Sequence, residues 1–249
     1  MQEAVEADTR GDLAAARQLY YRALLDLPDD PQIWINLGAL FRSQKNFALS
    51  LAAQSKAFAL DPDNLATCTN LANILDDVGD HGRAVVLRGK LAGARPDDPD
   101  SFALLIRSMR AAGQLDLAEQ TATSALQRFP DHPKIRFELG FQFLAQRRYA
   151  EGFLHYLTRR ATGQVRLPDT EIPRWTGADP QGKRILVLPE QGFGDTINFC
   201  RFLPFLKARG ATVHLLTRPA AHRRKLRVGC VWTGSEGYDR NDMRSFPHT

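Results

Sequence analysis

Apolar residues recur every three to four positions along most of the first 160 residues, the pattern of helices with one buried face. Prolines interrupt this pattern at intervals of 34 residues, at Pro28, Pro62, Pro96 and Pro130, and an aspartate follows each of them. Because proline stops one helix and turns the chain toward the next, the pattern predicts helices that repeat with this period.

Each repeat is long enough for two helices joined by a short turn. The expected pairs are 31–44 with 47–60, 65–78 with 81–94, 99–112 with 115–128, and 133–146 with 149–160. A first repeat keeps only its later half, with Tyr20 and Pro28 in register, and its first helix is cut short. The sequence therefore predicts an all-helical array over residues 1–166.

The second repeat carries the most complete motif. Trp34, Leu37, Gly38 and Phe41 fit W-x2-L-G-x2-Y, with phenylalanine in place of tyrosine. With a period of 34 residues, this motif resembles the tetratricopeptide repeat. The resemblance implies a mainly α fold, a superhelix of helix pairs whose curved inner surface is lined by the first helix of each pair. It also implies a protein or peptide partner on that concave surface.

Asparagines at equivalent positions are the candidate peptide-binding residues. Asn36 and Asn70 lie one period apart in the first helices of their pairs, with Asn73 close by, and the row resembles the asparagine ladder of O-linked N-acetylglucosamine transferases. Such amides hold a peptide backbone because each offers a donor and an acceptor. The alternative is that they are solvated polar positions. The row ends at Leu104 and Glu138.

The composition changes after the array. Prolines punctuate a linker over 167–183, and 184–188 then predicts a buried strand, 189–194 a glycine-bearing turn, 195–209 a helix and 212–216 a second strand. This order predicts a partial α/β, Rossmann-like segment over 184–249. Its turn offers backbone N–H groups at a helix N-terminus, where an anion can bind.

Two motifs in this segment resemble glycosyltransferase family 9, the heptosyltransferase-like GT-B enzymes that follow tetratricopeptide repeats in some bacterial proteins. The first is Glu-Gln-Gly-x-Gly-Asp-x2-Asn-Phe-x-Arg at 190–201. The second is Val-Gly-Cys-Val-Trp-Thr-Gly-Ser at 228–235, continued by Asp-Arg-Asn-Asp-Met-Arg-Ser at 239–245. The resemblance implies transfer of a sugar from a nucleotide-sugar donor to a protein or glycan acceptor.

The resemblance also assigns roles to individual residues. Asp195 matches the family's proposed catalytic base, although an aspartate at this position could equally cap its helix. The resemblance implies that the nucleotide-sugar donor or the acceptor is bound by Glu190, Gln191, Gly192, Gly194, Asn198, Arg201, Ser235 and Arg244. In the second motif, hydroxyl and guanidinium groups would neutralise a diphosphate leaving group.

Only about ten residues, 217–226, separate the second strand from the second motif, where the family has the rest of its first lobe. We therefore expect an incomplete, internally deleted GT-B domain. Its uncovered sheet edges and apolar face would favour self-association. Two functions stay open: a repeat-bearing glycosyltransferase, and a peptide-binding scaffold for protein–protein interaction.

The charge and the cysteine content of the chain point to no further functional site. Residues 1–166 carry 20 basic and 20 acidic residues, so the net charge of +5 arises from 167–249, with 13 against 8. This excess could serve a phosphate-bearing ligand or be a solvated surface. The three cysteines lack metal-ligand spacing, and the acidic start lacks the features of a signal peptide. We expect a cytoplasmic protein with no metal, no cofactor, no nucleic-acid partner and no membrane span.

Overall fold

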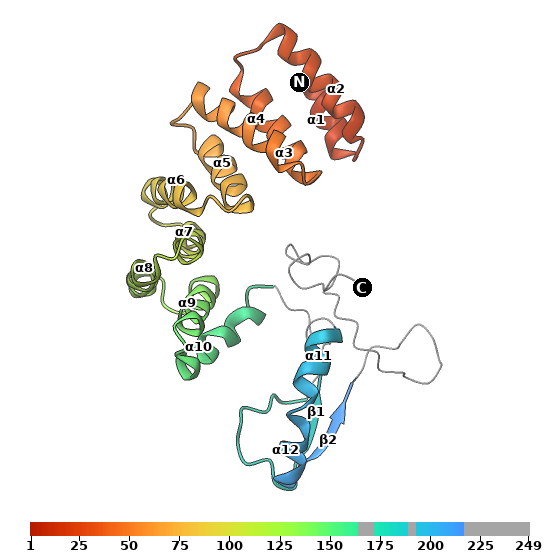
Figure 1. Cartoon of the computed structure of the whole chain (residues 1–249), viewed down its shortest axis with the longest axis vertical. Helices are drawn as coiled ribbons and strands as arrows, with labels where there is room; N and C mark the ends of the chain where they lie inside the picture. The colour runs from red at the N-terminus through yellow and green to blue at the C-terminus, as the bar shows by residue number, and fades with distance from the viewer. Residues whose placement is uncertain (164–171, 189–192, 217–249) are drawn as a thin grey trace, which may run out of the picture. The chain divides into compact units, whose positions relative to one another are not determined.

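The computed structural model describes residues 1–163, 172–188 and 193–216 (Figure 1). The chain divides into two compact units, Met1–Thr162 and Gly163–Thr249. The predicted end of the array at residue 166 lies outside the described residues, as does the second glycosyltransferase-like motif at 228–245.

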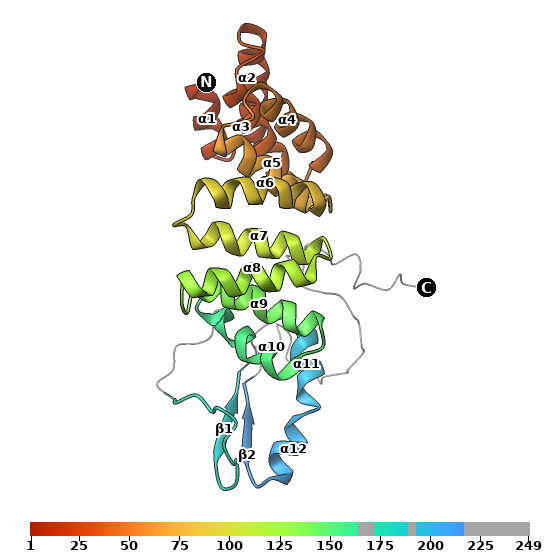
Figure 2. The same ribbon diagram turned by 90° about the vertical axis from the view of Figure 1, so that its left-hand side faces the viewer.

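The first unit is built from helices joined by short turns, and α6, α7 and α8 lie one above another in it (Figure 2). Every predicted pair is present, with helix ends within one residue of the expected ones as far as α9. The helices are α1 Gln2–Thr9, α2 Leu13–Asp26, α3 Pro31–Ser43, α4 Phe47–Leu60, α5 Leu65–Asp77, α6 His81–Ala94, α7 Pro99–Ala111, α8 Leu115–Arg128, α9 Pro133–Ala145 and α10 Tyr149–Tyr156, followed by the 3-10 turn Leu157–Arg160.

Helix starts are fixed by side chains that recur with the period. Asp12, Asn46 and Asp80 precede the second helices of their pairs, and each side chain accepts a hydrogen bond from a backbone N–H of the first turn. Asp30 and Asn64 do the same before α3 and α5. Such caps satisfy N–H groups that have no partner within the helix.

The turn inside each pair has one conformation throughout the array. Five residues spaced by 34 have positive φ angles, from 58° to 83°: Gly11, Lys45, Gly79, Gly113 and Arg147. The next residue donates its N–H to a carbonyl five positions back, as Asn46 does to Phe41 at 2.9 Å. This is the Schellman arrangement, which prefers glycine at the left-handed position. Lys45 and Arg147 adopt the left-handed conformation although they carry a Cβ atom, which glycine lacks.

The buried apolar residues form three clusters. The first includes Tyr20, Ile33 and Leu37 near the N-terminus, the second belongs to α5 and α6, and the third lies mainly on α7, α8 and α9. Polar side chains are buried where α5, α6 and α7 meet, among them Arg88 and Ser108. These polar groups interrupt the apolar packing there.

Gly38 and Trp34, two motif residues of the second repeat, differ in how closely they pack against their neighbours. Gly38 permits a close approach of α3 and α4, since a Cβ atom there would lie 2.2 Å from the Gln54 side chain. Trp34 packs against the N-terminal cluster but is only half-buried. Its indole N–H donates to the carbonyl of Pro28 at 2.8 Å, which ties α3 to the preceding turn.

The second unit contains the predicted strand, helix and strand. Strands β1 Arg184–Val187 and β2 Thr212–Leu215 pair in parallel, with Arg184 opposite Thr212. The helix predicted over 195–209 is divided into α11 Phe193–Cys200 and α12 Leu203–Ala208. Pro204 explains the break, because a proline ring clashes with the carbonyl four residues earlier and has no N–H to donate. Gly210 closes α12 with a φ of 86°, as predicted.

Candidate functional site

The first helices of the pairs form the inner side of the array. In Figure 1, α5 and α7 lie on the inner side of the arc and α6 and α8 on the outer side. Because the repeat is 34 residues long, side chains separated by this interval occupy the same face of successive inner helices. The inner face is therefore the first candidate for a binding surface.

The three predicted asparagines differ in what they contact. Asn36 accepts a hydrogen bond from the Gln32 amide at 2.9 Å and also bonds the buried Tyr20 hydroxyl. Asn73 accepts a bond from the Arg88 guanidinium at 2.7 Å. Asn70 is half-buried, and no described residue forms a hydrogen bond with its side chain. Of the three, Asn70 has the carboxamide that is open to a ligand.

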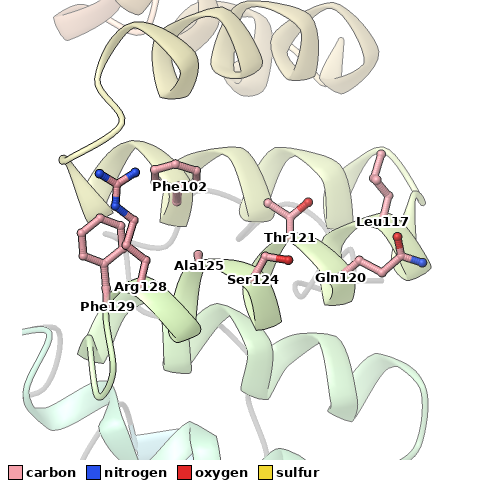
Figure 3. Close-up of a pocket in the computed structure, with 8 residues that line it drawn as sticks. All are labelled: Phe102, Leu117, Gln120, Thr121, Ser124, Ala125, Arg128 and Phe129. Atoms are coloured by element: carbon pink, nitrogen blue, oxygen red, sulfur yellow. The ribbon is translucent and has the colours of Figure 1, made fainter.

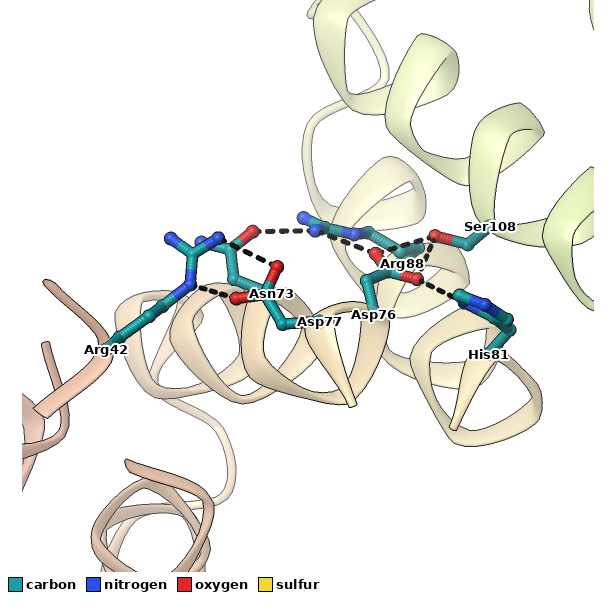
Figure 4. A network of polar contacts seen from close by, with 7 residues as sticks. All are labelled: Arg42, Asn73, Asp76, Asp77, His81, Arg88 and Ser108. Atoms are coloured by element: carbon teal, nitrogen blue, oxygen red, sulfur yellow. Dashed lines mark hydrogen bonds and ion pairs between the residues drawn. The ribbon is translucent and has the colours of Figure 1, made fainter. Parts of the chain in front are cut away.

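A buried ion pair lies behind Asn73 (Figure 4). The Arg88 guanidinium on α6 contacts the Asp76 carboxylate on α5 at 3.2 Å, and the two side chains are 3% and 8% exposed. Ser108 of α7 donates to the same carboxylate at 2.9 Å, and His81 lies 3.3 Å from it. Burial lowers the pKa of Arg88, against the opposing effect of Asp76. These contacts join three successive helices.

Two further arginines on inner helices pair with carboxylates of the next inner helix. Arg42 of α3 forms an ion pair with Asp77 of α5, partly exposed to solvent. Arg110 of α7 contacts Glu138 of α9 at 3.0 Å, and its guanidinium lies 5.0 Å from the centre of the Phe141 ring. Burial raises the pKa of Glu138, although Arg110 opposes this.

These ion pairs were missed in the sequence analysis, although a signal for them exists. Arg42, Asp76 and Arg110 stand one period apart, so one helix position carries a charge in three successive repeats. Each of these residues belongs to a different ion pair, with Asp77, Arg88 and Glu138 as the partners. Glu138, interpreted there only as a break in the asparagine row, is the buried partner of Arg110.

A second candidate surface is a pocket of about 450 Å3 along α8 (Figure 3). Its lining residues are Phe102, Leu117, Gln120, Thr121, Ser124, Ala125, Arg128 and Phe129. One period earlier, Ser124 is replaced by Lys90, whose ammonium group reaches Asp63 at 2.7 Å. Because serine is too short to make this contact, the position stays open along α8. Its lining is mixed, with the apolar residues Phe102, Leu117, Ala125 and Phe129 beside the polar residues Gln120, Thr121, Ser124 and Arg128.

The predicted transferase residues are only partly described. Gly194, Asp195 and Asn198 lie on α11, where Gly194 and Asn198 are exposed. Arg201 follows the helix, and its guanidinium lies 4.9 Å from the centre of the Phe202 ring. Glu190, Gln191, Gly192, Ser235 and Arg244 lie outside the described residues. Among the residues that are described, no three histidine, cysteine, aspartate or glutamate side chains form a group that could hold a metal ion.

Over the same ranges, 1–163, 172–188 and 193–216, no helix combines the length and the apolar character that crossing a membrane requires. The second unit nevertheless exposes large apolar side chains. Phe199 and Phe205 are 61% and 67% exposed, on either side of Phe202.

Comparison with known proteins identifies the fold of the array. Protein FlbA of Caulobacter vibrioides is 29% identical over 203 residues, which are 78% of this chain and 33% of FlbA. The chain thus spans about a third of the length of this relative. MamA from Desulfovibrio magneticus RS-1 superposes with a TM-score of 0.58 at 15% identity, covering 66% of this chain and 92% of that chain. MamA MSR-1 gives 0.55 at 18% identity, covering 66% and 94%.

No family model matches the chain. The likeness to the MamA structures establishes a helical array of the tetratricopeptide-repeat type. None of these comparisons supports a glycosyltransferase domain.

Proposed function

We propose that the helical array is a scaffold that holds a partner protein along its inner helices. The observation that carries the proposal is the succession of the inner helices α3, α5, α7 and α9, in which side chains 34 residues apart occupy the same face. Such arrays stack into extended concave surfaces, and this shape suits an extended polypeptide better than a small molecule. The tetratricopeptide-repeat fold also favours a protein partner.

Within this surface, Asn70 is the residue we propose to contact the partner's main chain. Its carboxamide has no hydrogen-bond partner among the described residues, so it is able to donate to a peptide carbonyl and accept from a peptide N–H. Asn36 and Asn73 already bond Tyr20 and Arg88. We therefore assign these two a supporting role, in which they orient the helices beside the peptide.

Selection of a phage-displayed library of random dodecapeptides on the full chain tests this proposal. We expect one or more peptides to be enriched, and the Asn70→Ala variant to bind them about fivefold to tenfold more weakly, because one to two hydrogen bonds are lost. Gln127→Ala is the matched control, since it removes an exposed amide from α8. Absence of any enriched peptide, or equal losses in both variants, would contradict the proposal.

A second proposal concerns the α/β unit, and one observation favours it. Strands β1 and β2 pair in parallel, and α11 and α12 lie between them along the chain. If the resemblance to glycosyltransferase family 9 reflects function, this unit contributes to binding a nucleotide sugar, with Asp195 as the base. The N–H groups at the start of α11 then favour a diphosphate, while Asp195 opposes it by adding negative charge.

Titration with a nucleoside diphosphate, followed through the amide signals of Gly192, Gly194 and Asp195 in NMR spectra, tests this second proposal. We expect weak binding, on the order of millimolar, or about 4 kcal/mol. Transferase activity is not expected from this chain alone. Amide signals that do not shift up to tens of millimolar ligand would mean that the turn is only a structural bend.

A further inference from the structure

The inner face carries one positive charge more than its carboxylates balance. Three arginines, Arg42, Arg88 and Arg110, each contact a carboxylate on a neighbouring helix. Arg107 of α7 is exposed, and no described carboxylate lies within ion-pair distance of it. A cation that folding leaves unpaired, next to three that are paired, is available to an anionic group of a ligand.

Arg107 also lies in the row of positions that faces the proposed partner. It precedes Arg110 by one helical turn, so the two share a face of α7, and the Arg110 guanidinium stacks on the Phe141 ring. Asn73 and Phe141 occupy the position of Arg107 in the repeats before and after it. The charge of Arg107 acts on two neighbouring groups. Burial is the main cause that lowers the pKa of Arg88, and Arg107 adds to it. Burial is also the main cause that raises the pKa of Glu138, and Arg107 opposes it together with Arg110.

We infer that the partner is an acidic segment in extended conformation, which places a carboxylate of aspartate or glutamate against Arg107 while its main chain runs past Asn70. The inference rests on the proposed scaffold function and specifies the chemistry of its partner. A guanidinium binds a carboxylate through two parallel hydrogen bonds, so Arg107 would also fix the register of the segment. Leu104, one turn earlier on α7 and half-buried, offers an apolar contact beside this pair.

The charges favour an acidic peptide over a nucleic acid. Binding of a nucleic acid is dominated by many phosphate contacts from lysine and arginine. Among the described arginines of α3, α5, α7 and α9, Arg107 alone forms no ion pair, and the carboxylates of Asp77 and Glu138 pair with Arg42 and Arg110. These carboxylates repel a dense polyanion, whereas a single side-chain carboxylate can approach Arg107 between them.

The peptides selected on the full chain provide the test. We expect aspartate or glutamate to be enriched at one position, and selection on the Arg107→Glu variant to enrich lysine or arginine there. For one acidic peptide and its amide analogue (Asp→Asn or Glu→Gln), Arg107→Ala should weaken binding of the acidic form about tenfold, and of the analogue less than twofold. Between 50 mM and 500 mM salt, the acidic peptide should lose affinity for the wild type but not for Arg107→Ala.

Arg22→Ala is the matched control, because Arg22 is an exposed arginine on the second helix of its pair. Circular dichroism melting curves of all variants must coincide, which separates binding from stability. Enriched peptides without an acidic position, or equal affinities for wild type and Arg107→Ala, overturn this inference but leave the scaffold function standing. Tighter binding of single-stranded RNA than of any acidic peptide overturns it as well. Absence of any enriched peptide overturns the scaffold function itself.

Discussion

Replacing Asp76 with alanine is expected to lower the free energy of unfolding by about 3–5 kcal/mol. The substitution leaves the Arg88 guanidinium, only 3% exposed, without its carboxylate, and it removes the acceptor of Ser108. A buried charge without a partner cannot be compensated by solvent. Urea unfolding followed by circular dichroism measures the loss.

Asp77→Ala is the matched control for this prediction. Asp77 is the next residue on α5, and its partner Arg42 is 45% exposed, so its loss should cost less than about 1 kcal/mol. In the double variant Asp76→Ala with Arg88→Met, we expect much of the lost stability to return, because an apolar pair can replace a buried ion pair at little cost. Similar losses for Asp76→Ala and Asp77→Ala would mean that Arg88 reaches water.

A methyl group added at Gly140 should destabilise the protein by about 1–3 kcal/mol. A Cβ atom at Gly140 would lie 2.7 Å from the backbone nitrogen of Tyr156 and 3.1 Å from the carbonyl oxygen of Gly152. Because both are backbone atoms, α9 and α10 would have to separate to make room. The thermal midpoint of Gly140→Ala, measured by circular dichroism, should therefore fall.

Gly89→Ala should change stability in the opposite direction. Gly89 is exposed in the middle of α6, and nothing lies within 4 Å of a Cβ atom built there. Alanine favours a helix interior over glycine by about 0.5–1 kcal/mol, so the thermal midpoint should rise. A rise for both variants would show that α9 and α10 have space between them, contrary to the structure.

The local order of the array could be predicted from the sequence because one period controls it. The equal spacing of the prolines, together with the repeating apolar pattern, predicted the helix ends of α3 to α9 to within one residue. The division of the last predicted helix of the second unit was missed, although Pro204 stands in the sequence. Proline has no N–H to donate and its ring clashes with the carbonyl four residues earlier, so Pro204 ends the first of the two helices near Cys200.

The partners of polar side chains could not be predicted in the same way. Asn36, Asn70 and Asn73 look alike in sequence, but Tyr20 engages the first and Arg88 the third. These partners lie 16 and 15 residues away along the chain and meet the asparagines only when the helices stack. A repeat position thus predicts which face a side chain occupies, but not whether that side chain remains open to a ligand.

The separation of the apolar residues into three clusters affects how the array loses its structure. The polar contacts around Asp76 lie where α5, α6 and α7 meet, and α6 joins two of the clusters there, since its Ala92 and Val85 pack with residues of α7 to α9. Stability in such an array is a sum over units and their junctions, so separate segments can open independently. We expect backbone amides of the three clusters to exchange their hydrogens at distinct rates. A ligand lying across two clusters would slow the exchange in both, which couples segments that otherwise fluctuate separately.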